Sequence, residues 1–226
     1  MNLATKHIED INSILEEKTI RWLYPILETG QAVCKEFFNI NANFFDCNDY
    51  INCVPGHILS YGINKQAYNQ SQLPLFPFKL NREVINRRNN SATPLLKKGN
   101  VTISLLRSPN RFKIEDTDKK YLRQKCKKNN EINTQMYLPD LLLDEENNDQ
   151  GESYHGVLLY GAVKYWEGIN FADIVFFDSN LKEFYHSIDL MDRLHVYETN
   201  MTEEEKEKSL LNARNIIKES NKILEV

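Results

Sequence analysis

The sequence lacks several features that would assign the chain to a functional class at once. Its 226 residues contain no apolar run of the roughly 18–20 residues needed to cross a bilayer. Residues 1–18 are amphipathic and of mixed charge, without the basic and then apolar segments of a signal peptide. We therefore expect a cytoplasmic protein that has no membrane partner.

Glycine and cysteine are both scarce. Eight glycines leave little room for a phosphate-cradling loop, and neither a P-loop nor a Gly-x-Gly-x-x-Gly fingerprint occurs. The four cysteines form no Cys-x-x-Cys pair and have no histidine at zinc-finger spacing. In a protein that is not secreted, we expect them to be reduced, buried thiols. The sequence thus predicts no cofactor and no structural metal.

Catalytic motifs are also missing. The five histidines are scattered, without a His-Glu-x-x-His motif, and each is expected to be a surface or capping residue. Asp140, Asp173, Asp178 and Lys164 are the residue types of a Mg²⁺-dependent nuclease, but the Glu-x-Lys that should follow Pro-Asp is absent. Asp173 alternates with apolar residues and is expected to face solvent. The nuclease stays an alternative on residue types alone, and no catalytic residue is assigned.

What the chain does have is an uneven charge distribution. Residues 79–128 carry 15 Lys and Arg against 4 Asp and Glu, a local net charge of +11. The whole chain has a net charge of −4, so the remainder carries −15. A basic segment between acidic flanks is typical of a surface that binds a polyanion.

Nucleic acid is the polyanion that this segment favours. Its arginines and lysines are interleaved with asparagines, which suits phosphate contacts from loops flanking a strand. The sequence shows no helix-turn-helix, zinc finger, RNA-recognition motif or Gly-x-x-Gly loop. The residues expected to contact nucleic acid are Arg82, Arg87, Arg88, Lys97, Lys98, Arg107, Arg111, Lys119, Lys120, Arg123 and Lys127. The first hypothesis is therefore a non-enzymatic nucleic-acid-binding protein.

A protein–protein interaction module is the second hypothesis. In this hypothesis the protein is an inhibitor or adaptor that docks on an acidic partner through the same basic surface. That surface could also contact the acidic flanks of its own chain. Tyr165 and Trp166 are candidate contacts, because both residue types are frequent at binding hot spots. The abundance of Asn and Lys is typical of an AT-rich genome, which favours a phage or mobile element of a low-GC bacterium.

The periodicity of the chain predicts an α+β fold in a single domain, 1–226. We expect helices over 4–18 and 20–38, the latter interrupted at Pro25 and Gly30. Further along, a mixed or antiparallel sheet and a C-terminal amphipathic helix are expected. Strands are predicted over 58–63 and 101–106 and a hairpin over 157–164 and 171–177, with a basic helix over 117–128 and an acidic surface loop or linker over 144–151.

The helix predicted over 202–225 has the clearest signals. Thr202 and Glu205 form a capping box, and Leu210, Ile217 and Leu224 repeat along one face. This face should pack on the sheet of its own chain, with a homodimer as the alternative.

Two segments of the sequence resemble each other. Residues 58–65 read ILSYGINK and residues 157–164 read VLLYGAVK. A duplicated half-domain would produce such a pair, but chance similarity between two strands is the preferred interpretation.

Overall fold

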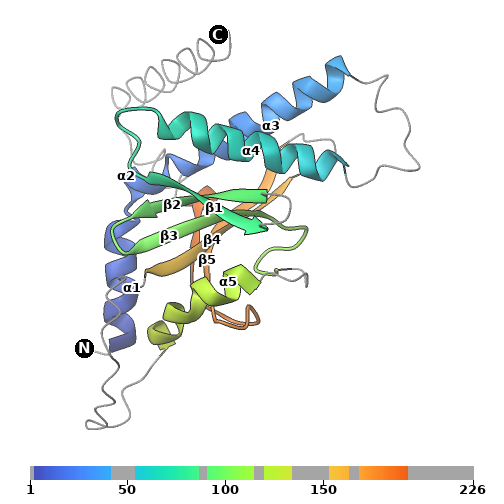
Figure 1. Cartoon of the computed structure of the whole chain (residues 1–226). Helices are drawn as coiled ribbons and strands as arrows, with labels where there is room; N and C mark the ends of the chain where they lie inside the picture. The colour runs from blue at the N-terminus through green and yellow to red at the C-terminus, as the bar shows by residue number, and fades with distance from the viewer. Residues whose placement is uncertain are drawn as a thin grey trace.

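A computed structural model describes residues 3–41, 54–86, 91–114, 120–133, 153–162 and 168–192 of the chain. In these residues a six-stranded mixed sheet lies between two helical layers (Figure 1). The predicted α+β class is confirmed, with N-terminal helices preceding the sheet. The segments 144–151 and 202–225 lie outside the described residues, as do Tyr165 and Trp166.

The first layer is formed by the N-terminal helices. They are α1 (Leu3–Ile14), α2 (Glu17–Ile20), α3 (Leu23–Ile40) and α4 (Val54–Ser71). The predicted interruption of the second helical stretch is wrong, because α3 runs unbroken through Pro25 and Gly30. Pro25 is the third residue of α3, where a backbone N–H would have no acceptor inside the helix, so proline costs no hydrogen bond.

The strand predicted over 58–63 is wrong, because this segment lies within α4. Leu59, Ile63 and Ala67 are fully buried at four-residue intervals, which places them on one face of a helix. α4 packs closely on α3 through small residues. A Cβ atom on Gly30 would lie 2.7 Å from Ile63 Cγ1, and one on Gly62 would lie 2.3 Å from Cys34 Sγ.

The sheet follows the order of the chain from one edge to the other. Its strands are β1 (Lys79–Asn86), β2 (Ser91–Lys98), β3 (Val101–Arg107), β4 (Tyr154–Ala162), β5 (Ile169–Phe177) and β6 (Phe184–Asp189). β3 and β4 are parallel, whereas the other neighbouring strands are antiparallel. The strand predicted over 101–106 and the predicted hairpin are confirmed as β3 and β4–β5. β1, β2 and β6 were not predicted.

The two faces of the sheet bury separate cores. Leu158 and Ile174 face α1–α4, and their neighbours Val157 and Val175 face a second core. This second core is covered by α5 (Lys120–Lys125) and the 3₁₀ helix η2 (Cys126–Asn133). The basic helix predicted over 117–128 is therefore confirmed from residue 120 onward. β4 and β5 are covered on both faces, which explains their almost continuous burial.

Candidate anion-binding groove

A row of polar and basic residues crosses the sheet on the face covered by α5. Strand pairing aligns Lys79 of β1 with Lys97 of β2, Lys97 with Thr102 of β3, and Thr102 with His155 of β4. Lys79 and Lys97 are both exposed and directly opposite each other. Like charges in this relation destabilise a sheet, so a bound anion would relieve the repulsion.

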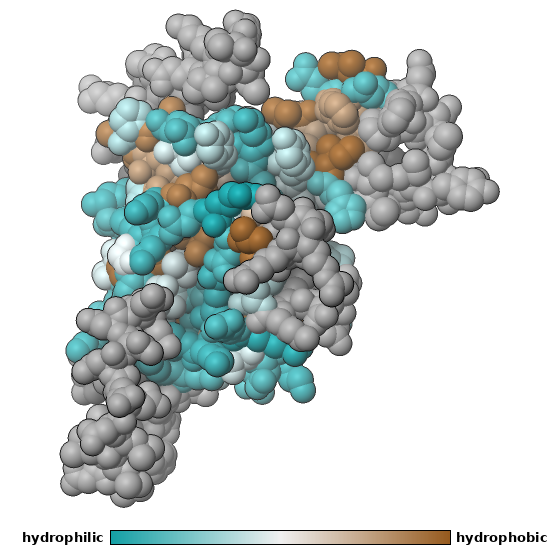
Figure 2. Space-filling view, viewed as in Figure 1, coloured by the Kyte–Doolittle hydropathy of each residue, from teal (hydrophilic) through white to brown (hydrophobic). Residues whose placement is uncertain are grey.

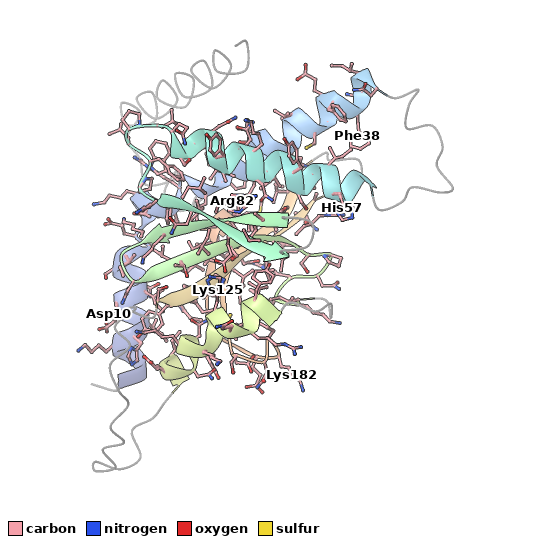
Figure 3. The ribbon with its side chains drawn as sticks, in the orientation of Figure 1. Asp10, Phe38, His57, Arg82, Lys125 and Lys182 are labelled. Atoms are coloured by element: carbon pink, nitrogen blue, oxygen red, sulfur yellow. The ribbon has the colours of Figure 1, made fainter. Side chains whose placement is uncertain are left out.

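A hollow of about 390 Å³ opens between this row and the α5–η2 segment. Four lysines line it from two separate parts of the chain: Lys97 from β2, Lys125 from α5, and Lys127 and Lys128 from η2. Asn81, Gln124, Thr102 and Ser153 add amide and hydroxyl groups. Figure 3 shows Lys125 between α5 and the sheet. We call this hollow the lysine groove.

The lysine groove carries a positive charge that its own surroundings balance only in part. Lys125 Nζ lies 2.6 Å from Glu83 Oε2, and Lys128 Nζ lies 5.4 Å from the centre of the Tyr154 ring. In the described residues no carboxylate pairs with Lys97, Lys127 or Lys128. Four lysines therefore face one carboxylate, and such a surplus favours an anionic ligand.

A buried histidine lies beneath the groove. Thr102 Oγ1 is 2.8 Å from His155 Nδ1, and Ser104 Oγ is 3.1 Å from His155 Nε2. Asn129 holds the same residue by its backbone, because its side chain accepts from the His155 N–H and donates to the His155 carbonyl. Burial, with the positive charge of Lys125, lowers the pKa of His155 to about 3, so the ring is neutral. The expectation that each histidine lies at the surface or in a cap is wrong for His155.

The His155–Ser104 contact does not form an accessible nucleophile. Ser104 is 1% exposed and His155 is 0% exposed, so neither is accessible from solvent. A substrate carbonyl would have to reach within about 3 Å of the hydroxyl oxygen for attack. The arrangement instead satisfies a buried imidazole with two hydroxyl partners.

The predicted nucleic-acid contacts divide between the two faces of the sheet. Lys97 and Lys127 line the lysine groove, and Arg123 is exposed on α5. Lys98 lies on the opposite face, where its ammonium group contacts Thr19 and Glu16. Arg82 also lies on that face, near α4 (Figure 3), and so does Arg107, whose guanidinium group lies next to Gly56 of α4. Arg87, Arg88 and Lys119 lie outside the described residues, as does the Lys120 side chain.

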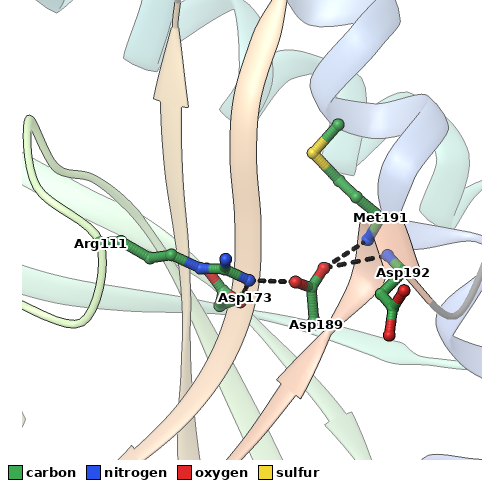
Figure 4. A network of polar contacts seen from close by, with 5 residues as sticks. All are labelled: Arg111, Asp173, Asp189, Met191 and Asp192. Atoms are coloured by element: carbon green, nitrogen blue, oxygen red, sulfur yellow. Dashed lines mark hydrogen bonds and ion pairs between the residues drawn. The ribbon is translucent and has the colours of Figure 1, made fainter.

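Arg111 is held by carboxylates (Figure 4). Its Nε and Nη2 donate to the two Asp173 oxygens at 2.8 and 2.7 Å, and Nη2 also contacts Asp189. The hydrogen bond to Asp173 is the largest cause of a raised Arg111 pKa. The expectation that Asp173 faces solvent is wrong: its exposed fraction is 0%, because β5 is covered on both faces.

Of the remaining residues of the nuclease alternative, the structure describes Asp178. Asp178 accepts backbone N–H groups of Asn180, Lys182 and Glu183 in the β5–β6 turn. Burial acts to raise the pKa of Asp178, but these hydrogen bonds lower it overall. Asp140 and Lys164 lie outside the described residues, and no group of three potential metal-binding side chains occurs within them.

Sequence reasoning missed Lys79, Thr102 and His155 as parts of this site. Lys125 and Lys128 belong to the basic helix predicted over 117–128, which was expected to contact nucleic acid, and Lys79 was included only through the composition of the basic segment. Their convergence depends on the pairing of β1, β2 and β3, and the first two of these strands carry no clear alternation. No local pattern connects residue 155 with residue 102.

Comparison with protein-family models, curated proteins and solved structures finds no match for this chain. Among the described helices, none has the length and apolar character required to traverse a membrane.

Proposed function

We propose that this protein is a non-enzymatic nucleic-acid-binding protein of the cytoplasm that holds a phosphate backbone in the lysine groove. The observation that carries the proposal is the convergence of Lys97, Lys125, Lys127 and Lys128 on one hollow, where Glu83 is the one carboxylate among the described residues that pairs with any of them. Flexible ammonium groups bind phosphates as point charges, and neighbouring amides such as Asn81 and Gln124 suit phosphate and sugar contacts.

Binding of this kind depends on charge and not on base sequence. Each phosphate neutralised by a lysine releases counterions, so the affinity falls steeply as salt is added. We therefore expect weak sequence preference and strong salt dependence.

The test compares two double variants that change the net charge equally. Lys97→Glu/Lys127→Glu alters exposed residues of the groove, and Lys6→Glu/Lys35→Glu alters exposed residues of α1 and α3. Affinity for labelled single- and double-stranded DNA is measured by fluorescence anisotropy from about 50 to 200 mM salt. The groove variant should lose binding, or its slope of log affinity against log salt should be smaller by roughly 1.4–1.8, the change expected when two phosphate contacts are lost.

Two outcomes would overturn the proposal. One is no binding by the wild-type protein at about 50 mM salt, where electrostatic contacts are strongest. The other is an equal loss in both double variants, because net charge alone would then explain the result.

A second candidate function, a protein–protein interaction module, has one observation in its favour. Val33, Phe37 and Ile40 are exposed at helical spacing, and Figure 2 shows hydrophobic residues gathered at the far end of α3. Exposed apolar patches often mark protein contacts. If this end of α3 binds a second copy, Ile40→Asp should abolish any concentration-dependent association seen by sedimentation velocity. A wild-type protein that stays monomeric at all concentrations would leave this candidate without support.

A further inference from the structure

At the β6 edge of the sheet, which is the opposite edge from β1 and β2 of the lysine groove, three side chains form a stack. The Arg111 guanidinium carbon lies 5.0 Å from the centre of the Phe112 ring. The Phe112 ring in turn stacks on the Phe184 ring of β6, with centres 5.1 Å apart and planes inclined by 22°. Phe184 is 44% exposed, so one end of the stack is open to solvent.

This stack is held rigidly. Arg111 is fixed by Asp173 and Asp189, and Phe112 packs on the second core beside Leu122 and Cys126. Phe112 has a φ of 59°, which lies in the left-handed region that bulky residues rarely adopt. Such backbone strain concentrates at functional sites, where the surrounding structure maintains it.

An exposed aromatic ring beside an edge strand is otherwise unfavourable. β6 ends the sheet, and an apolar side chain at a sheet edge promotes unwanted pairing between chains. An aromatic ring with a free face is, however, the group on which unpaired bases stack in proteins that bind single strands.

The groove and the stack both adjoin α5, because Gln124 and Lys125 line the groove and Phe112 packs on the second core that contains Leu122. Helical geometry places Gln124 and Lys125 toward the lysine groove and Arg123 on the side of α5 away from it. Lys97 of the groove is on β2 and Phe184 is on β6, four strand spacings away, so the sheet separates them by about 19 Å, which roughly six nucleotide steps span. Exposed Arg123 offers a cation along this path.

We infer that the exposed ring of Phe184 is a stacking site for an unpaired nucleobase, and that the nucleic acid bound in the lysine groove is single-stranded. This inference rests on the proposed function, because the groove supplies the phosphate contacts. A duplex does not satisfy the site, since its bases are already stacked on one another and cannot cover the ring.

The experiment separates the ring from the charges. Fluorescence anisotropy measures binding of three probes of equal length: an oligothymidine of about 20 nucleotides, an abasic strand with the same backbone, and a duplex. The variants are Phe184→Ala, Phe184→Leu, which keeps apolar packing on Phe112, and Phe184→Trp, which keeps a ring. Tyr61→Ala is the control for removal of an exposed ring, because Tyr61 is 72% exposed but lies on α4.

We expect the wild-type protein to bind oligothymidine more tightly than the duplex. Phe184→Ala and Phe184→Leu should weaken oligothymidine binding by about 5- to 150-fold, the effect of one stacked base. Their affinity for the abasic strand should be unchanged, Phe184→Trp should retain binding to oligothymidine, and Tyr61→Ala should behave as the wild type.

Each contrary result has a distinct meaning. Unchanged oligothymidine binding by Phe184→Leu, or an equal loss on the abasic strand, would overturn the stacking site while leaving the groove proposal intact. A preference for duplex would overturn the single-strand assignment. Failure of all three probes to bind would overturn the proposed function together with this inference.

Discussion

At the scale of single residues, burial decides the chemistry of the polar side chains. His155 and Asp173 come from strands that are covered on both faces, and both are fully buried. Each is satisfied by specific partners: hydroxyl groups for the imidazole, and the Arg111 guanidinium for the carboxylate. The alternation around Asp173 did not place it correctly, because alternation indicates solvent exposure only when one face of a sheet is open. The scattered spacing of the histidines gave no indication that His155 lies within a covered strand.

Acidification is expected to destabilise the protein through His155. The pKa of this ring is about 3 in the folded protein and about 6.5 in the unfolded chain, so the unfolded state binds the proton first. The contribution of the neutral ring to the free energy of unfolding is fully present above about pH 6.5 and is lost as the pH falls toward about 3. Its slope is about 1.4 kcal/mol per pH unit.

Urea unfolding at several pH values between about 7.5 and 5 measures this slope. His155→Gln removes the titrating ring but retains hydrogen-bonding groups, so its stability should depend less on pH than that of the wild type. Identical pH dependence in the two proteins would show that His155 does not carry the effect.

Arg111 and Asp173 are expected to respond unequally to truncation. Arg111→Ala leaves a fully buried carboxylate without its bidentate partner, which should cost about 3–5 kcal/mol of unfolding free energy. Asp173→Ala leaves an arginine that is 43% exposed and still contacts Asp189, so about 1.5–3 kcal/mol is expected. Urea titration compares the two variants with Lys113→Ala, an exposed control expected within about 0.5 kcal/mol. Equal losses would contradict this asymmetry.

At the scale of elements, the two similar segments adopt different structures. Residues 58–65 lie in the helix α4, whereas residues 157–162 lie in the strand β4, so the similarity is no duplication of a structural unit. A short apolar run does not distinguish the two states by itself. The helical signal lies beyond the run, since Ala67 continues the four-residue spacing of Leu59 and Ile63.

The same limit applies to the candidate site. Composition identified the basic segment, and β3, β4 and β5 were recognisable from their apolar runs. Lys97 and Lys98 are adjacent in the sequence and were treated alike, but successive residues of a strand point to opposite faces. Assigning Lys97 to the groove and Lys98 to Thr19 requires knowing that both belong to β2. The sequence of β2 does not indicate a strand clearly, because it contains Pro94.

Alanine substitution of Gly30 or Gly62 is expected to separate α3 from α4. A Cβ atom on Gly30 would lie 2.8 Å from the Ile63 backbone Cα, so relief requires movement of a helix. Overpacking should cost about 1–3 kcal/mol and exceed the gain in helix propensity, which is at most about 1 kcal/mol. Thermal unfolding measures the balance.

Gly56→Ala is the matched control for these glycine variants. Its new methyl group would meet the flexible end of the Arg107 side chain, which can move away at little cost. A Gly30→Ala protein as stable as Gly56→Ala would mean that the two helices are less tightly fixed than their contact indicates.

At the scale of the whole molecule, the described residues of the basic segment are divided between the two faces of the sheet. One share lines the lysine groove beside α5, and Lys98, Arg82 and Arg107 lie on the face of α1–α4. Among the described residues of 79–128, the positive charge therefore does not form one continuous surface, and only part of it is available to a single ligand.

The amphipathic helix predicted over 202–225 is outside the described residues, and its role stays a prediction. If its apolar face packs on the rest of the chain, Ile217→Ala should cost about 2–5 kcal/mol in urea unfolding. A loss below about 0.5 kcal/mol would mean that the face is exposed in the monomer. Sedimentation equilibrium would then test the homodimer as the alternative cover.

The parallel pairing of β3 with β4 divides the sheet into two antiparallel meanders, β1–β3 and β4–β6. Within each meander neighbouring strands follow one another in the chain, whereas β3 and β4 are separated by the long connection from residue 108 to residue 153. Closing a long loop is a slow event in folding, so each meander should form early and their junction last. Cleavage within residues 134–152 would leave every described helix and strand intact on one fragment or the other. The two fragments, mixed in solution, are expected to reassemble along the β3–β4 seam as a split protein.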